Sequence, residues 1–434
     1  MYIKEIAASL YPWDIADEGV ESCVDNLIHL CDVNSVYLVG LMHKEKRPLD
    51  QLYYPHNPKR KFYIPEDSRV YYQMDEANFV KTPLKPLYSK ETFLKDKDWL
   101  KELIGYARQK GLKVGVEISH TIYDADIAER KYPEILQKNV YGMPVGGDKI
   151  IDQRILCPNH EYVREYIKAL FYDTVKNNDI DFIQSCLVMF YEGRALRNEH
   201  DNEIANVLGT LHGGCFCESC GVKAKQMGYD WDKIQHDMKK LHDIVTEREL
   251  SDMMTLRLLE QGNLLATGLL LEHPSFYQWL EFRTRSITEL FKDIYESIKK
   301  ANTKVEFRYN TYIRYPELGG MNFAGIRNYV DSVRESDYSE QSGDLKRLEL
   351  KRTKILKIRR AIGYDKDLIA AVGVRMNANE DIIRESLKML AKTGIDGISL
   401  GHYDGATFGR LRAVKEGMLE GEINLQEHEN KSKQ

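Results

Sequence analysis

Eight short runs of apolar or β-branched residues recur along the 434-residue chain, and a longer amphipathic segment follows each of them. This alternation is typical of a parallel sheet, because a parallel strand needs a crossover, usually a helix, to bring the chain back. Eight such units most simply close into a (β/α)8 TIM barrel, and a doubly wound open sheet is the alternative. The runs occupy residues 5–10, 35–42, 113–119, 181–188, 304–310, 331–340, 368–374 and 397–402.

Several segments between the runs have the periodicity and the start signals of helices. Asp98 and Asn379 immediately precede two of these segments and are of the residue types that cap helix N-termini. The predicted helices cover residues 20–30, 99–109, 163–176, 286–300, 345–361 and 380–392.

The length of the chain indicates insertions, because a barrel of this class needs only about 250 residues. We predict a single barrel domain over residues 1–424 and a flexible tail over 425–434. Long irregular segments near 43–97, 120–160 and 189–285 follow the second, third and fourth predicted strands. All three are strand-to-helix connections, which form the face where barrel enzymes build their active sites.

The formal net charge of −5 gives no general attraction to nucleic acid or to an anionic membrane, so we expect neither partner. The N-terminal segment lacks the basic and apolar regions of a secretory signal, and the seven cysteines are an odd number for a disulfide framework. Both features favour a reducing cytoplasm. The sequence leaves the oligomeric state open, a homo-oligomer included.

Three cysteines, Cys215, Cys217 and Cys220, lie within the stretch "CFCESC". Their spacing would strain a disulfide but suits tetrahedral thiolate coordination. Cys157, in "ILCPNH", is the best candidate for a fourth ligand, because the remaining cysteines fall within a predicted helix or strand. A four-thiolate zinc site has no open coordination position and would be structural. One disulfide or a set of free thiols are the alternatives.

The same region resembles a known family. The segments "CPNHEYVREYI", "DIDFIQSCLVMFYEG" and "CFCESC" follow one another as in family 42 glycoside hydrolases, the β-galactosidases, over roughly residues 150–230. The resemblance implies a barrel, a carbohydrate substrate and a structural zinc on the four cysteines named above. It also nominates Glu340, in "YSEQSG", as the nucleophile, although this segment follows the sixth predicted strand instead of the seventh. The family's glutamate at the end of the fourth strand is absent, and Glu192 follows several residues later.

A glycosidase needs two carboxyl groups, one to protonate the leaving oxygen and one to attack the anomeric carbon or to activate water. Glu192 is our candidate for the acid and Glu340 for the nucleophile or base. The alternatives are a solvated loop position for Glu192 and a structural ion pair or hydrogen bond for Glu340. Asp404 is a further candidate carboxylate, or a cap of the last helix, and His402 is a further candidate acid/base.

Polar side chains at the predicted strand ends are candidates for substrate binding. Glu117 lies between two apolar residues, so its side chain points into the barrel, where it either pairs with Arg308 or Arg375 or binds substrate. These two arginines and Arg314 make an acidic saccharide a candidate ligand, because a guanidinium group matches a carboxylate or sulfate. The predicted substrate-binding residues are Glu117, His120, Gln184, Arg308, Asn310, Tyr312, Tyr338 and Arg375.

Together these features predict a carbohydrate-active enzyme with a structural zinc, specifically a glycoside hydrolase that acts on an oligosaccharide. Two alternatives stay open. A lyase or isomerase acting on sugar acids would use His402, His120 or a tyrosine as its base, and the arginines would hold the substrate carboxylate. A saccharide-binding barrel would bind the same ligands without turnover.

Overall fold

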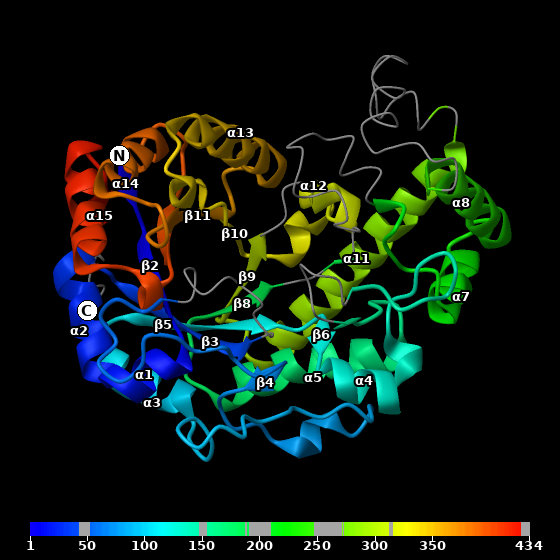
Figure 1. The fold of residues 1–434 in the computed structure, drawn as a ribbon, viewed down its shortest axis with the longest axis horizontal. Helices are drawn as coiled ribbons and strands as arrows, with labels where there is room; N and C mark the ends of the chain where they lie inside the picture. The colour runs from blue at the N-terminus through cyan, green and yellow to red at the C-terminus, as the bar shows by residue number, and fades with distance from the viewer. Residues whose placement is uncertain are drawn as a thin grey trace, which may run out of the picture.

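Eight parallel strands close into a barrel in the computed structural model (Figure 1). The structure describes residues 1–42, 53–146, 154–186, 189–190, 210–246, 271, 273–311 and 316–426. The pairing of the first barrel strand, β2, with both β3 and β12 closes the ring, which confirms the predicted (β/α)8 TIM barrel. The barrel strands are β2 (Glu5–Leu10), β3 (Ser35–Met42), β5 (Lys113–Ser119), β8 (Phe182–Cys186), β9 (Glu306–Thr311), β10 (Ser332–Glu335), β11 (Asp367–Gly373) and β12 (Gly397–Gly401).

Helices surround these strands (Figure 1), and the two predicted N-caps act as expected. Asp98 accepts a hydrogen bond from the backbone nitrogen of Lys101 (3.0 Å), and Asn379 accepts one from that of Ile382 (2.9 Å). Each bond satisfies a backbone donor that the first helical turn leaves free. The main helices are α2 (Val20–Cys31), α3 (Trp99–Gln109), α5 (Glu161–Asn177), α11 (Pro274–Ala301), α13 (Leu345–Ile362), α14 (Glu380–Leu390) and α15 (Phe408–Glu420).

Two elements have bounds that differ from those predicted by more than two residues. Helix α11 begins at Pro274, well before residue 286, because Trp279 and Phe282 in its first turns are fully buried. Strand β10 ends at Glu335, whereas the predicted run continues to residue 340. The chain leaves the sheet there and forms a short 3-10 helix, η6 (Ser339–Ser342).

The connections at the carboxyl ends of the strands carry small elements of their own. Among the described residues, no helix has the length and apolar character needed to cross a bilayer. Most of the predicted flexible tail, 427–434, lies outside the described residues. The remaining elements are β1 (Tyr2–Ile3), α1 (Pro12–Glu18), β4 (Arg69–Val70), η2 (Glu76–Phe79), β6 (Ile122–Tyr123), α4 (Ala125–Lys131), η3 (Pro133–Ile135), β7 (Arg154–Ile155), α7 (Glu218–Gln226), α8 (Trp231–Thr246), η4 (Pro316–Gly319), α12 (Phe323–Ile326), η5 (Arg327–Tyr329), η7 (Tyr403–Gly405) and β13 (Asn424–Leu425).

A buried ion pair fills the amino-terminal end of the barrel. Arg308 is 1% exposed and donates from Nη1 and Nη2 to the two carboxylate oxygens of Glu5, at 3.0 and 2.8 Å. It also contacts Glu306 (2.9 Å) and Ser332 (3.2 Å), and all three partners are the first residues of their strands. Burial disfavours ionisation of Glu5, but the charge and hydrogen bonds of Arg308 outweigh burial, so its pKa is lowered. The pair therefore stabilises the fold at neutral pH and loses that contribution as the pH falls through this lowered pKa.

The variant Arg308→Met should destabilise the protein by about 3–5 kcal/mol, because it leaves Glu5 buried without a counter-charge. Urea unfolding followed by circular dichroism measures the change. Lys4→Met is the control, because it removes an ion pair with Asp367 whose side chains are 48% and 36% exposed. Pairs of that kind contribute about 0.2–1 kcal/mol. An equally small effect of Arg308→Met would contradict a structural role for this arginine.

Candidate functional site

The four predicted metal-binding cysteines lie together in the structure. Cys157, Cys215, Cys217 and Cys220 are all buried, and their four sulfur atoms lie within 4.8 Å of one another. The sulfur of Cys157 is 3.4 Å from that of Cys217 and 3.5 Å from that of Cys220. These separations are far longer than a disulfide bond of about 2.05 Å. They are close to the edge of about 3.8 Å expected of a ZnS4 tetrahedron with Zn–S bonds of about 2.3 Å.

Hydrogen-bond donors around the sulfurs also suit thiolates. The backbone nitrogen of Lys138 donates to Cys215 Sγ, and Asn159 Nδ2 donates to Cys220 Sγ, both at 3.4 Å. Donors of this kind orient metal ligands and stabilise their charge. The four residues could therefore hold a metal ion as a closed site.

This cysteine cluster ties two long connections of the barrel together. Cys157 lies just before α5, in the connection that follows β5, whereas the other three cysteines lie in the connection that follows β8. Between them, Phe216 donates its backbone N–H to the carbonyl of Lys138 (2.8 Å), and its ring packs on Trp279 and Trp231. The cluster therefore fixes the loop conformation on the carboxyl-end face of the barrel.

A hydrogen-bonded network of polar side chains crosses the barrel interior towards its carboxyl end. Its centre is Arg334 of β10, which is 1% exposed. Arg334 donates from Nε to Ser399 (2.9 Å), from Nη1 to the Asn310 side-chain oxygen (2.7 Å) and from Nη2 to the Tyr338 hydroxyl (2.8 Å). The Tyr37 hydroxyl lies 3.3 Å from that of Ser399. We did not predict a role for Arg334, although a charged residue inside a predicted strand is itself a signal of a buried partner.

Glu117 of β5 joins the same network. Its side chain points into the barrel, as predicted, and the residue is 7% exposed. The amides of Gln184 and Asn310 both donate to its Oε2 atom, Asn310 at 3.3 Å. Burial raises the pKa of Glu117, while the charge of Arg334 and the hydrogen bond from Gln184 oppose that rise. The predicted residues Glu117, Gln184, Asn310 and Tyr338 thus lie in one connected set.

The two arginines predicted to pair with Glu117 have other partners. Arg308 is bonded to Glu5 at the opposite end of the barrel, and Arg375 lies 3.6 Å from Asp404. The prediction missed these pairings because each brings together residues from distant parts of the chain.

His402 lies at the carboxyl end of β12. Its Nδ1 atom is 2.7 Å from the hydroxyl oxygen of Ser9, and its ring centroid lies 5.1 Å from that of Tyr11 and 5.8 Å from that of Tyr338. The contact with Tyr338 places His402 beside the Arg334 network.

Asp404 is buried in the following turn, and Arg375 is its ion-pair partner. It does not cap the last helix, because Thr407 accepts the capping hydrogen bond of α15. Asp14 of α1 is also buried, and its pKa is raised by burial and by the charge of Asp404. Two carboxyl groups therefore lie near each other at this end of the barrel.

Glu340 is fully buried against the helix layer. One carboxylate oxygen accepts hydrogen bonds from Lys351 of α13 and Ser386 of α14, and the other accepts the backbone N–H of Gly373 (3.0 Å). We considered two roles for Glu340, a catalytic carboxylate and a structural ion pair. This environment is that of a structural ion pair. It offers the carboxylate no face for a substrate.

His120, another predicted residue, does not join the network either. His120 is fully buried with no hydrogen-bond partner for either ring nitrogen, and burial lowers its pKa to about 3. Its ring packs against Phe171 of α5, because residues 117 and 120 face opposite sides of the strand end. Glu192 and Tyr312 lie outside the described residues.

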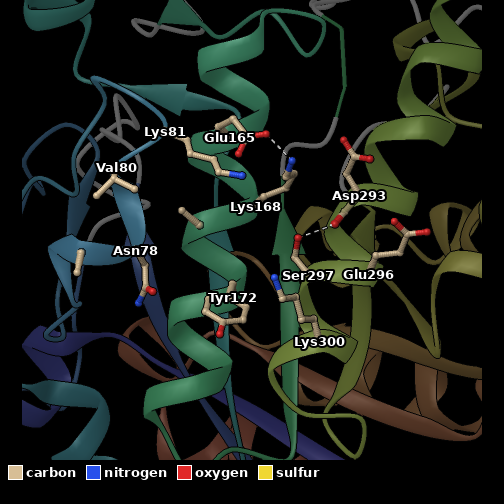
Figure 2. A pocket seen from close by; sticks show the side chains of 12 residues that line it. Asn78, Val80, Lys81, Glu165, Lys168, Tyr172, Asp293, Glu296, Ser297 and Lys300 are labelled. Carbon is tan, nitrogen blue, oxygen red and sulfur yellow. Dashed lines mark hydrogen bonds and ion pairs between the residues drawn. The ribbon is translucent and has the colours of Figure 1, made fainter.

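A groove of about 450 Å³ lies on the outside of the barrel between η2, α5 and α11. Figure 2 shows charged side chains of both signs along it, with Lys168 paired to Glu165, and Ser297 bonded to the backbone of Asp293. The interior network gathers four of the eight predicted substrate-binding residues, whereas none of the predicted site residues lines this groove.

Comparisons with known proteins agree with the fold. No protein-family profile and no curated protein sequence match the chain. The PgaB (BpsB) glycoside hydrolase domain from Bordetella bronchiseptica aligns with a TM-score of 0.58 and 13% identity, over 96% of this chain and 98% of that one. The catalytic domain of a β-amylase from Paenibacillus polymyxa aligns with a TM-score of 0.54 and 11% identity, over 97% and 99%.

A β-galactosidase from the psychrophilic Marinomonas ef1 aligns with a TM-score of 0.54 and 11% identity, over 96% of this chain. The alignment covers 59% of that β-galactosidase. At such identities the likeness shows a shared barrel fold, and the fold alone does not define a reaction.

The variant Glu340→Gln should destabilise the protein by about 3–5 kcal/mol, because it leaves the Lys351 ammonium group buried without a counter-charge. The double variant Glu340→Leu, Lys351→Met should recover much of that loss, since it removes both charges. Urea unfolding measures all three proteins. A Glu340→Gln protein that is as stable as the parent but has lost turnover would instead support the catalytic role.

Proposed function

We propose that the protein is a carbohydrate-active enzyme, a glycoside hydrolase that acts on an oligosaccharide at the carboxyl end of its barrel. The observation that carries this proposal is the interior network, which holds the buried Glu117 carboxyl beside the Arg334 guanidinium. It lies in a barrel whose structural neighbours are described as a glycoside hydrolase, a β-amylase and a β-galactosidase. Oxygen-rich substrates such as sugars are recognised by convergent polar side chains of this kind.

Hydrolysis needs a second carboxylate besides a proton donor. Asp404 is the candidate within the described residues, and Glu192 remains a candidate outside them. We do not assign this role to Glu340, because its partners in α13, α14 and β11 enclose it.

The arginine contacts favour a neutral saccharide over an acidic one. Glu5 and Asp404 already pair with Arg308 and Arg375, and three side chains accept hydrogen bonds from Arg334. Of these three arginines, Arg308 and Arg334 are fully engaged by side chains of the barrel, and Arg375 alone keeps a donor, Nε, that has no partner among the described residues and is left for a substrate carboxylate or sulfate. This distribution also weighs against a lyase that holds a sugar acid.

We further propose that Cys157, Cys215, Cys217 and Cys220 bind a structural zinc ion. Its contribution would be to fix the two connections that it joins, because a closed tetrahedral site has no position for substrate. The sulfur separations of 3.4 and 3.5 Å and the N–H donors around them support the assignment.

Protein purified without added metal should contain about one zinc per chain by elemental mass spectrometry. Cys217→Ser should lose that zinc and lower the melting temperature, because the cysteine cluster no longer holds the two connections together. Cys31→Ser is the matched control, since Cys31 is also a buried free cysteine but lies in α2. A zinc-free protein with a disulfide among the four cysteines, or one in which both variants keep the metal, would contradict the assignment.

The full chain should release 4-nitrophenol from at least one member of a panel of 4-nitrophenyl glycosides, or new reducing ends from a panel of oligosaccharides. Asp404→Asn should lower that rate by about 10²-fold or more if Asp404 is the second carboxylate. The matched control is Asp365→Asn, because Asp365 is also ion-paired to an arginine but its side chain is 56% exposed. An unsaturated product absorbing in the ultraviolet would indicate elimination instead, and binding without any product would indicate a binding barrel.

A further inference from the structure

Glu117 differs from the other carboxylates on the inner face of the barrel strands. Glu5 and Glu306 both contact Arg308 directly, so a cation neutralises them. Glu117 receives only amide hydrogens, and within the described part of the chain no lysine, arginine or histidine forms an ion pair with it. A buried carboxyl group without a bonded cation can exist in its neutral, protonated form.

An amide spacer separates Glu117 from the nearest positive charge. The side-chain oxygen of Asn310 accepts a hydrogen bond from Arg334 (2.7 Å), while its nitrogen donates to Glu117 (3.3 Å). The Asn310 amide can bridge the guanidinium and the carboxyl group because it has an acceptor at one end and a donor at the other. Direct contact with Arg334 would hold the carboxyl ionised, and the spacer weakens that effect.

The hydrogen bonds to Glu117 are unevenly shared between its two oxygens. Both amide donors reach Oε2, and no described residue donates to Oε1. A proton on the carboxyl group would therefore sit on Oε1 without displacing an existing hydrogen bond. Because Glu117 is 7% exposed and lies near the end of β5, Oε1 is the oxygen left for a ligand.

Among the described residues, the titratable and charged groups that face Glu117 are Arg334 from β10, Tyr37 from β3 and Cys186 from β8. Burial raises the pKa of Tyr37 to about 12 and also raises that of Cys186, so both are neutral near pH 7. Two opposing effects therefore decide the ionisation of Glu117. Burial disfavours the carboxylate, whereas the charge of Arg334 and the hydrogen bond from Gln184 favour it.

We infer that Glu117 is the proton donor of the reaction and that Asn310 is the positioning residue that keeps Arg334 from pairing with it; this inference rests on the proposed hydrolase function. The Oε1 proton passes to the glycosidic oxygen as the bond from that oxygen to the anomeric carbon breaks, and the bonding electron pair stays on the oxygen. Water adds to the anomeric carbon and gives its proton to the second carboxylate. That carboxylate releases the proton to solvent, and Glu117 regains one from solvent.

The first test needs no substrate. Carbon-13 NMR of the full chain labelled at the glutamate side-chain carboxyl should show a resonance that titrates above the usual value of about 4.3 and is absent in Glu117→Gln. Glu335→Gln is the matched control, because Glu335 is also buried, on the outer side of β10, and burial raises its pKa to about 7. Arg334→Gln should raise the pKa of Glu117 further, whereas Arg334→Lys keeps the charge and should shift it less.

The second test uses aryl glycosides of one sugar that the parent protein hydrolyses. Glu117→Gln should lower kcat by about 10²–10⁴-fold with a poor leaving group such as phenol. It should lower kcat far less with 2,4-dinitrophenol, which leaves without protonation. Asn310→Asp should raise the pH at which activity is lost on the alkaline side, because a second carboxylate beside Glu117 favours its protonated form. Glu335→Gln should leave kcat and its pH dependence unchanged.

The outcomes separate this inference from the proposed function. If the parent hydrolyses glycosides but Glu117 titrates at an ordinary value, or Glu117→Gln slows all leaving groups equally, the inference is wrong and the hydrolase proposal stands. If the parent turns over no glycoside or oligosaccharide, the hydrolase proposal fails, and the role of proton donor fails with it. A high pKa together with a leaving-group-dependent loss in Glu117→Gln supports both.

Discussion

The need to compensate charge inside a closed barrel is the constraint on which the rest of this structure depends. The strands are covered by helices outside and by each other inside, so a charged side chain on the inner face cannot remain hydrated. At the amino-terminal end the solution is direct, because Arg308 bonds to both oxygens of Glu5. At the carboxyl end Arg334 instead bonds to neutral partners, and an amide stands between it and Glu117. The first arrangement leaves nothing for a ligand, whereas the second leaves a carboxyl group whose charge state can change.

The connections on the carboxyl-end face are held by a separate set of contacts. Strand pairing fixes the barrel but not the long segments that follow β5 and β8. The cysteine cluster and the packing of Phe216 between Trp231 and Trp279 join these segments at one place. A site at the carboxyl ends of the strands needs such support, because precise geometry cannot come from an unrestrained loop.

Features carried by local pattern could be predicted from the sequence. Alternation of strands and helices predicts the barrel, Asp98 and Asn379 mark their helix starts, and the apolar neighbours of Glu117 indicate that it points inwards. Pairings between distant segments could not be predicted. Glu5 and Arg308 are 303 residues apart, and the sequence around each of them gives no sign that the other is its partner. Glu340 shows the second limit. Its predicted role assumed a strand that continues to residue 340, but β10 ends at Glu335, so the carboxylate lies among helices and not at the barrel end.

The structural neighbours and the interior of this barrel give different kinds of information. The structural neighbours share the fold of this chain at 11–13% sequence identity. Proteins that share a fold can catalyse many different reactions. Within the described residues the two carboxyl groups that we propose to be catalytic lie on β5 and after β12, whereas the family 42 resemblance expects them after the fourth and seventh strands. The proton donor proposed above, Glu117, therefore lies on a different strand from the glutamate used in that family. A buried carboxyl group bridged by an amide to an arginine is the chemistry that makes such a change of position possible.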